Sequence, residues 1–188
     1  MARFTRDQLE SFRDTEVPDL LGPDVRLLFV GINPGLWTAA TQTHFAHPAN
    51  RFYPALLRAG ILTKPVDQAS GMTDADRDLL RSRGIGITNL VPRATARASE
   101  LTAEELRAGG RRLEEVIRRT APRVVAVAGI TAYRSAFGRP RAVLGPQPET
   151  LGGARLWVVP NPSGLNAHET VASLAEAYAA PARVAGLI

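Results

Sequence analysis

Apolar residues along the chain gather in short continuous runs, most of which are followed by glycine, proline or asparagine. The runs span residues 26–32, 86–91, 123–129 and 155–160. A short apolar run bounded by turn-forming residues is typical of a strand that is buried on both faces. The pattern therefore predicts three or four buried strands.

The segments between these runs carry apolar residues at helical spacing. Helices are predicted over residues 51–60, 73–84, 102–120 and 168–180, with a further one within 5–12. Thr102 and Glu105 form the T-x-x-E pattern of a capping box, and Pro181 is predicted to end the last helix. Gly109 and Gly110 weaken the middle of the third of these helices, which indicates close packing there. Residues 139–153, rich in glycine and proline, are predicted to be a loop.

The strands and helices alternate along the chain, which predicts a parallel sheet covered by helices on both faces. In such sheets ligands bind beyond the carboxyl ends of the strands. Two loops follow predicted strands in this way: "GINPG" at residues 31–35 and "NPSGLNAH" at residues 161–168. These loops are therefore the candidate functional segments.

The loop "GINPG" has three possible explanations. Glycine and proline are common in a plain turn between a strand and a helix. A phosphate-binding loop is a poor match, because the G-x-G-x-x-G spacing and the G-K-[ST] ending are both missing. In the third interpretation Asn33 is kept for its side-chain amide, which can hold a water or read the edge of a pyrimidine.

The loop "NPSGLNAH" also allows several interpretations. Ser163 and His168 could act as nucleophile and base, but the context is not G-x-S-x-G and no acidic residue is in place to orient the histidine. Leu165 is an apolar residue in a loop. It either packs against the following helix as a hydrophobic staple or serves as a wedge that enters a base stack.

The composition narrows the functional classes. The chain has 188 residues, 45% hydrophobic content and a formal net charge of +5, and almost all of its positive charge is carried by arginine. These values predict one domain with a full core and make an acidic partner such as nucleic acid plausible. The chain has no cysteine, which excludes disulfides, Cys-ligated metal and a thiol nucleophile. His44 and His47 lie three apart without a nearby carboxylate, so we predict ordinary loop histidines and no metal site.

Three motifs in this order resemble one family closely: "GINPGL", "FAHPANRF" and "NPSGL", supported by "VPRAT", "AGGRRLEEVI" and "WVVPNPSGL". The chain is similar to the mismatch-specific uracil-DNA glycosylases of the uracil/thymine-DNA glycosylase superfamily. The resemblance implies an α/β fold, a three-layer α/β/α sandwich with a central, mostly parallel sheet of four to five strands. We expect a single glycosylase domain over residues 1–188, with an N-terminal helical segment at 1–25 and a core at 26–188.

The resemblance also implies roles for single residues. Asn33 corresponds to the asparagine that positions the attacking water, and Phe45 to the aromatic residue that stacks on the extruded base. Backbone groups around Ile32 and Phe45 would hydrogen-bond the pyrimidine, and Asn161 would lie beside the pocket. The remaining residues would contact DNA: Ser163 at the backbone phosphate, and Gly164, Leu165 and Asn166 in the vacated base stack.

The activity implied is that of a monofunctional enzyme that hydrolyses the N-glycosidic bond of uracil flipped out of duplex DNA, favouring G·U mismatches. No cofactor and no metal are expected, and the expected partner is double-stranded DNA with uracil mismatches. We expect a cytoplasmic monomer without membrane attachment. One alternative is a broader glycosylase for single-stranded uracil, hypoxanthine or xanthine, and another is a DNA-damage binding module.

Some positions leave the interpretation open. Trp37 and Thr38 stand where better-known relatives have small residues, so we expect poor activity on thymine. Asn89 in "GITNLV" could replace or supplement Asn33. Four arginines near the motifs are either phosphate contacts or solvated surface charges, and these are Arg51, Arg93, Arg97 and Arg111.

Overall fold

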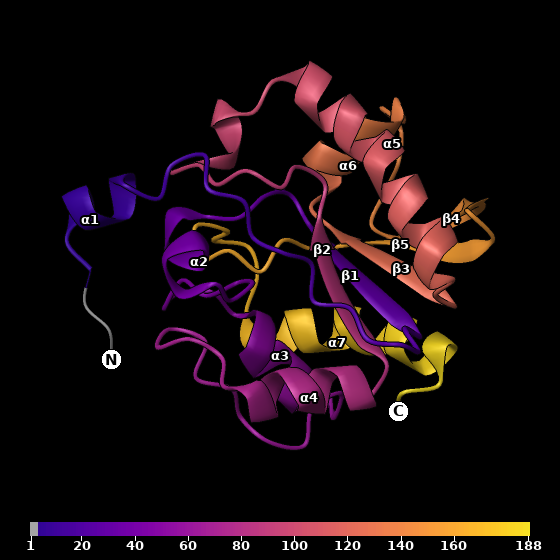
Figure 1. Cartoon of the computed structure of the whole chain (residues 1–188). Coiled ribbons are helices and arrows are strands. Elements are labelled where there is room, and N and C mark those ends of the chain that lie inside the picture. Colours follow the sequence, from indigo (N-terminus) through magenta and orange to yellow (C-terminus); the bar gives the residue numbers. More distant parts are fainter. Residues whose placement is uncertain (1–3) are drawn as a thin grey trace.

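A five-stranded sheet forms the centre of the computed structural model, which describes residues 4–188 (Figure 1). Its strands lie in the order β2-β1-β3-β5-β4. β2, β1, β3 and β5 are parallel to their neighbours, and β4 runs antiparallel to β5. The bounds are β1 (Leu27–Gly31), β2 (Ile85–Asn89), β3 (Val124–Ala128), β4 (Gly145–Leu151) and β5 (Ala154–Val159). The predicted α/β fold with a mostly parallel sheet is therefore confirmed.

Helices cover both faces of this sheet (Figure 1). Leu27 and Phe29 of β1 pack on one side with α3 (Phe52–Arg58), α4 (Asp74–Ser82) and α7 (Val171–Ala185). The alternate residues Leu28 and Val30 pack on the other side with α5 (Ala103–Thr120) and α6 (Ile130–Phe137). Since side chains alternate between the faces of a strand, β1 contributes to two separate cores.

Three predictions about the elements are corrected by the structure. Residues 145–151, predicted as loop, form β4, an edge strand that pairs with β5 only near its two ends. Pro146 and Pro148 are tolerated there because an edge strand needs hydrogen bonds on one side only. The last helix begins at Val171 and continues through Pro181, which is buried inside α7. Packing of the helix against the core therefore outweighs the backbone hydrogen bond that proline removes.

The N-terminal segment differs most from its prediction. Helix α1 spans only Arg6–Glu10 and packs against α2 (Leu36–Thr41) rather than on the sheet. Residues 14–20 contain no helix, and we call them the N-terminal strap; Asp14 at its start is a turn residue with a φ of +62°. They run along β2 and the chain that follows it, with β-bridges from Leu20 to Ile87 and from Glu16 to Arg93. Residues 1–3 of the predicted helical segment lie outside the described residues.

The glycine pair in α5 allows the close packing that the sequence indicated. A Cβ atom on Gly109 would lie 2.6 Å from the carbonyl oxygen of Leu90, just beyond β2. We expect Gly109→Ala to lower the free energy of unfolding by about 2 kcal/mol, because overpacking against backbone forces the helix away. Urea denaturation measures this. Gly35→Ala is the control, since no atom lies within 4 Å of its added Cβ; equal losses in both variants would refute the packing argument.

Candidate active site

The two candidate loops meet at the carboxyl ends of the central strands, as predicted. The connection is made over Gly129, which follows β3 and donates a backbone hydrogen bond of 2.9 Å to Val159 of β5. A Cβ atom on Gly129 would lie 3.2 Å from Ile32 Cδ1 and 3.8 Å from Asn161 Nδ2. Ile32 and Asn161 therefore come from different loops to the same small region.

The Asn33 amide is held in one orientation. Its Nδ2 donates to the carbonyl oxygens of Pro34 and Arg93, both at 3.1 Å, and to Thr95 Oγ1 at 2.8 Å. The Thr95 hydroxyl donates its own hydrogen to the Arg97 carbonyl, so its oxygen must accept from Asn33. Three acceptors thus identify the nitrogen of this half-buried amide. Across residues 4–188 the structure gives Oδ1 no hydrogen-bond donor, which leaves that oxygen able to accept one.

Phe45 lies in an uncommon backbone conformation next to this loop. Its φ of +56° is in the left-handed region, which is rare for an aromatic residue and is often associated with functional sites. The Thr38 hydroxyl supports the turn by accepting a hydrogen bond of 3.3 Å from the backbone N–H of Ala46. One face of the Phe45 ring stacks on Phe52, with centroids 4.1 Å apart and 26° between planes. Phe45 nevertheless remains half-buried.

Gly31, the last residue of β1, lies between the side chains of Phe45 and Asn89. A Cβ atom at this position would lie 3.3 Å from Phe45 Cζ and 2.4 Å from Asn89 Oδ1. The second asparagine, whose role the sequence left open, therefore directs its amide oxygen toward the end of β1. The Asn89 amide oxygen and the Phe45 ring thus both lie against Gly31, two residues before Asn33.

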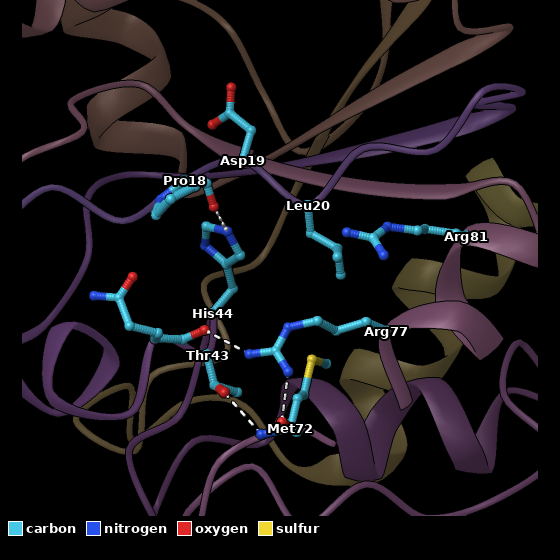
Figure 2. Close-up of a pocket in the computed structure, with 9 residues that line it drawn as sticks. Pro18, Asp19, Leu20, Thr43, His44, Met72, Arg77 and Arg81 are labelled. Carbon is cyan, nitrogen blue, oxygen red and sulfur yellow. Dashed lines mark hydrogen bonds between the residues drawn. The ribbon is translucent and has the colours of Figure 1, made fainter. Parts of the chain in front are cut away.

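His44 fixes the Asn89 amide. Its Nε2 lies 3.0 Å from the Pro18 carbonyl oxygen, which can only accept, so Nε2 carries the hydrogen (Figure 2). Nδ1 is then the acceptor for Asn89 Nδ2, at 3.2 Å. The sequence predicts an ordinary loop histidine at this position, whereas the structure buries His44 against Asn89. No local pattern reveals this arrangement, because its partners lie 26 and 45 residues away in the chain.

Burial lowers the pKa of His44, with a smaller contribution in the same direction from Arg77. The hydrogen bond to Pro18 and the charge of Asp19 act against this shift. Since the folded state disfavours the charged ring, stability is fully present above pH 6.5 and is lost as pH falls below it.

We expect the free energy of unfolding to fall below pH 6.5 by up to about 1.4 kcal/mol per pH unit on account of His44. Urea titrations between pH 7.5 and 5 measure this slope. His44→Gln retains a donor and an acceptor but cannot titrate, so its curve should be flatter by that amount. Identical slopes in the two proteins would show that His44 is not a buried neutral histidine.

The second loop is rigidly built. Asn161 Oδ1 accepts from the Ser163 backbone N–H at 3.0 Å, and Asn166 Nδ2 donates to the Asn161 carbonyl at 3.0 Å. The Arg51 guanidinium donates to the carbonyl oxygens of Ser163 and Asn166, each at 2.9 Å, and also to that of Glu169. Arg51, one of the candidate phosphate contacts, therefore holds the loop in shape. The Asn166 amide is also used within the loop, because its Oδ1 accepts from the His168 N–H.

Leu165 projects from this loop into solvent. Its exposed fraction is 89%, so it does not form the hydrophobic staple that was one of its two interpretations. Gly164 presses against the other motif, since a Cβ atom there would lie 2.7 Å from Ala49 Cβ. A rigid base and an exposed apolar tip are the geometry that a wedge requires.

The remaining candidates lie in different settings. Arg93 pairs with Glu105 at 2.6 Å and with Asp14 at 2.8 Å. Its hydrogen bond to the Glu105 carboxylate, together with the backbone N–H of Thr102, lowers the pKa of Glu105 to about 2. Arg97 and Arg111 are exposed on the surface.

The Trp37 indole donates to the Ala69 carbonyl and packs edge-on against Phe4 and His47. Trp37 and Thr38 are the two residues expected to disfavour thymine. Of these, only Thr38 makes a hydrogen bond to the turn at Phe45, through the Ala46 N–H.

Ser163 and His168 are not arranged as nucleophile and base. Ser163 Oγ accepts a hydrogen bond from the backbone N–H of Leu165, and His168 is exposed. His44 and His47 also make separate contacts, because His47 Nδ1 accepts from the Ala49 N–H.

Within residues 4–188, no three histidine or carboxylate side chains gather as metal ligands would. In the same span, the helices include none with the length and apolar character of a membrane span.

Comparison with known proteins identifies the family. The sequence model of the uracil DNA glycosylase superfamily matches residues 18–180, which includes both loops and every strand. The chain belongs to the uracil DNA glycosylase superfamily. Membership of this superfamily supports a DNA glycosylase activity and DNA as the partner.

A solved structure agrees with this assignment at the level of the fold. The solution NMR structure of a candidate uracil DNA glycosylase from Methanosarcina acetivorans superposes with a TM-score of 0.58. The match covers 90% of this chain and 96% of that chain, at 18% sequence identity. The superfamily member described here therefore shares the overall architecture of that protein.

Proposed function

We propose that this superfamily member is a monofunctional uracil-DNA glycosylase that acts as a single domain on double-stranded DNA and favours G·U mismatches. The observation that carries the proposal is the Asn33 amide, whose nitrogen is fixed by three acceptors and whose oxygen is left to accept. This amide oxygen lies two residues beyond β1, whose last residue, Gly31, packs against the half-buried Phe45 ring, and such a position suits the placement of a water molecule.

Base flipping accounts for the use of the other residues. The glycosidic bond of a stacked nucleotide is inaccessible, so the nucleotide must turn out of the duplex at a cost of a few kcal/mol. Leu165, exposed on its rigid loop, would enter the vacated stack and offset part of that cost. The flipped uracil would stack on Phe45, an interaction worth roughly 1–3 kcal/mol. A G·U pair is weaker than a correct pair, so mismatches open more easily.

Hydrolysis then separates a sugar that develops positive charge from a uracil that leaves as an anion. Asn33 Oδ1 would accept a hydrogen bond from the attacking water and hold its oxygen toward C1′. The new C1′–O bond replaces the C1′–N1 bond, the water loses its proton to solvent, and the uracil anion takes up a proton from solvent. Backbone N–H groups near Ile32 and Phe45 would stabilise the negative charge on the leaving base. Asn89 Oδ1 would accept from the ring N–H of uracil. No side chain in this scheme forms a covalent bond to the sugar, which makes the enzyme monofunctional.

Alkaline cleavage of labelled DNA tests the proposal. Duplexes with G·U, A·U, G·T or G·hypoxanthine pairs, and single strands with uracil, are incubated with the protein and then treated with alkali. We expect strand cleavage to be fastest with G·U, slower with A·U and slowest with G·T. Equal release from all substrates would favour the broader deaminated-base glycosylase. Binding without any release would instead favour a DNA-damage binding module, and both outcomes contradict the proposal.

A further inference from the structure

The N-terminal strap is joined to β2 and the following segment along its whole length. Leu20 exchanges two backbone hydrogen bonds with Ile87, of 2.9 and 2.8 Å. At the other end, the Asp14 N–H donates to the Ala94 carbonyl, and the Ala94 N–H donates to the Thr15 carbonyl, both at 2.9 Å. The strap therefore fixes the chain on both sides of Asn89.

Side chains fasten the middle of the strap. Asp19 is 11% exposed, and its Oδ1 accepts from the Thr88 hydroxyl at 2.6 Å. Asp19 Oδ2 accepts from Arg112 of α5 at 3.0 Å, and Arg112 also donates to the Asn89 carbonyl at 3.0 Å. Thr88 of β2 and Arg112 of α5 thus hold Asp19, the residue next to Pro18, and Arg112 links it to the Asn89 backbone.

The strap reaches the site amides by two routes. In the first route, the Pro18 carbonyl accepts a hydrogen bond from His44 Nε2 and so fixes the ring hydrogen on that nitrogen. His44 Nδ1 is then free to accept from Asn89 Nδ2. The second route goes through Ala94, which lies between the two residues, Arg93 and Thr95, that accept from Asn33 Nδ2. Pro18, Asp19, Leu20 and His44 line a cavity together with Arg77 and Arg81 of α4 (Figure 2). Its volume is about 180 Å³.

We propose that the N-terminal strap is a positioning element of the active site, and that its Pro18 carbonyl, acting through His44, orients the Asn89 amide toward the base. The inference rests on the proposed function, because it assigns Asn89 Oδ1 to the flipped uracil. His44 is a positioning residue in this scheme, since it touches Asn89 and not the reacting atoms. With Nδ2 turned to His44, the atom that Asn89 directs toward Gly31 is its oxygen, an acceptor, which suits a base with a ring N–H.

A double-mutant cycle tests this relay. His44→Phe removes the acceptor for Asn89 Nδ2 and is expected to lower single-turnover uracil release about tenfold. In an Asn89→Ala background the same change should have almost no effect, because the group that it positions is already gone. His44→Gln is expected to restore most of the rate, since its amide offers a donor to Pro18 and an acceptor to Asn89.

The controls separate the possible failures. If the wild-type protein releases no uracil from any substrate, the proposed function fails. If it does, and His44→Phe is as active as wild type or loses the same factor in both backgrounds, the relay is refuted. Urea denaturation checks that each variant folds.

A second measurement needs no activity. The Asn89 side-chain NH2 signals in a 15N NMR spectrum should exchange slowly with water in the wild type and in His44→Gln. If His44→Phe does not fold, the slow exchange in the other two proteins still decides the question. Fast exchange of these signals in the folded wild type would overturn the proposal.

Discussion

Asn33→Ala is expected to lower uracil release from a G·U duplex on the order of a thousandfold, while duplex binding changes little. The alanine removes the oxygen that would hold the attacking water and leaves the DNA-contacting loop untouched. Single-turnover kinetics with excess enzyme measure the chemical step, and fluorescence anisotropy with the same duplex measures binding.

Thr95→Val provides a matched comparison for this prediction. It removes one of the three acceptors of Asn33 Nδ2 but keeps the amide itself. We expect an intermediate loss of rate, because the amide becomes less firmly oriented. Unchanged release by purified Asn33→Ala would remove this residue from the mechanism, whatever Thr95→Val does.

Leu165→Ala is expected to slow uracil release from duplex DNA between about tenfold and a hundredfold, because filling the vacated stack offsets a base-flipping cost of a few kcal/mol. Release from a single strand should change far less, since no partner base leaves a gap. The rates for the two substrates, measured side by side, give the effect as a ratio.

Val143→Ala is the control for Leu165→Ala. Val143 is also highly exposed, at 65%, but it lies in the loop that precedes β4 rather than in the loop after β5. Its replacement should leave both rates unchanged. Equal loss by Leu165→Ala on duplex and single-stranded DNA would contradict a wedge and indicate a role in forming the loop.

The sequence predicted those features of the fold that depend on local patterns. The four apolar runs are four strands of the sheet, and the capping box predicted at Thr102 begins α5. β4 was missed because its prolines and glycine resemble a loop, and it exists only through pairing with β5. The continuation of α7 past Pro181 likewise depends on burial against the rest of the protein.

The positions of the candidate site residues could be predicted where they follow from a single sequence motif. Asn33 and Leu165 lie in the loops after β1 and β5, the two loops that the apolar runs indicate, and Phe45 lies against Gly31. Their roles stay predictions. The residues that hold them were not predictable, because their partners are distant in the sequence. Arg51 is 112 residues from Ser163, and His44 is 45 residues from Asn89. Such contacts follow only from the folded arrangement of strands, strap and loops.

The central claim is that the Asn33 carboxamide holds a water against the sugar of a flipped pyrimidine. A crystal structure of the protein with a G·U duplex, in which a 2′-fluorinated deoxyuridine resists hydrolysis, tests it most directly. The account predicts uracil stacked on Phe45, Leu165 in the base stack and a water between Asn33 Oδ1 and C1′. A uracil that remains paired in the duplex, or one bound away from Asn33 and Phe45, would contradict it.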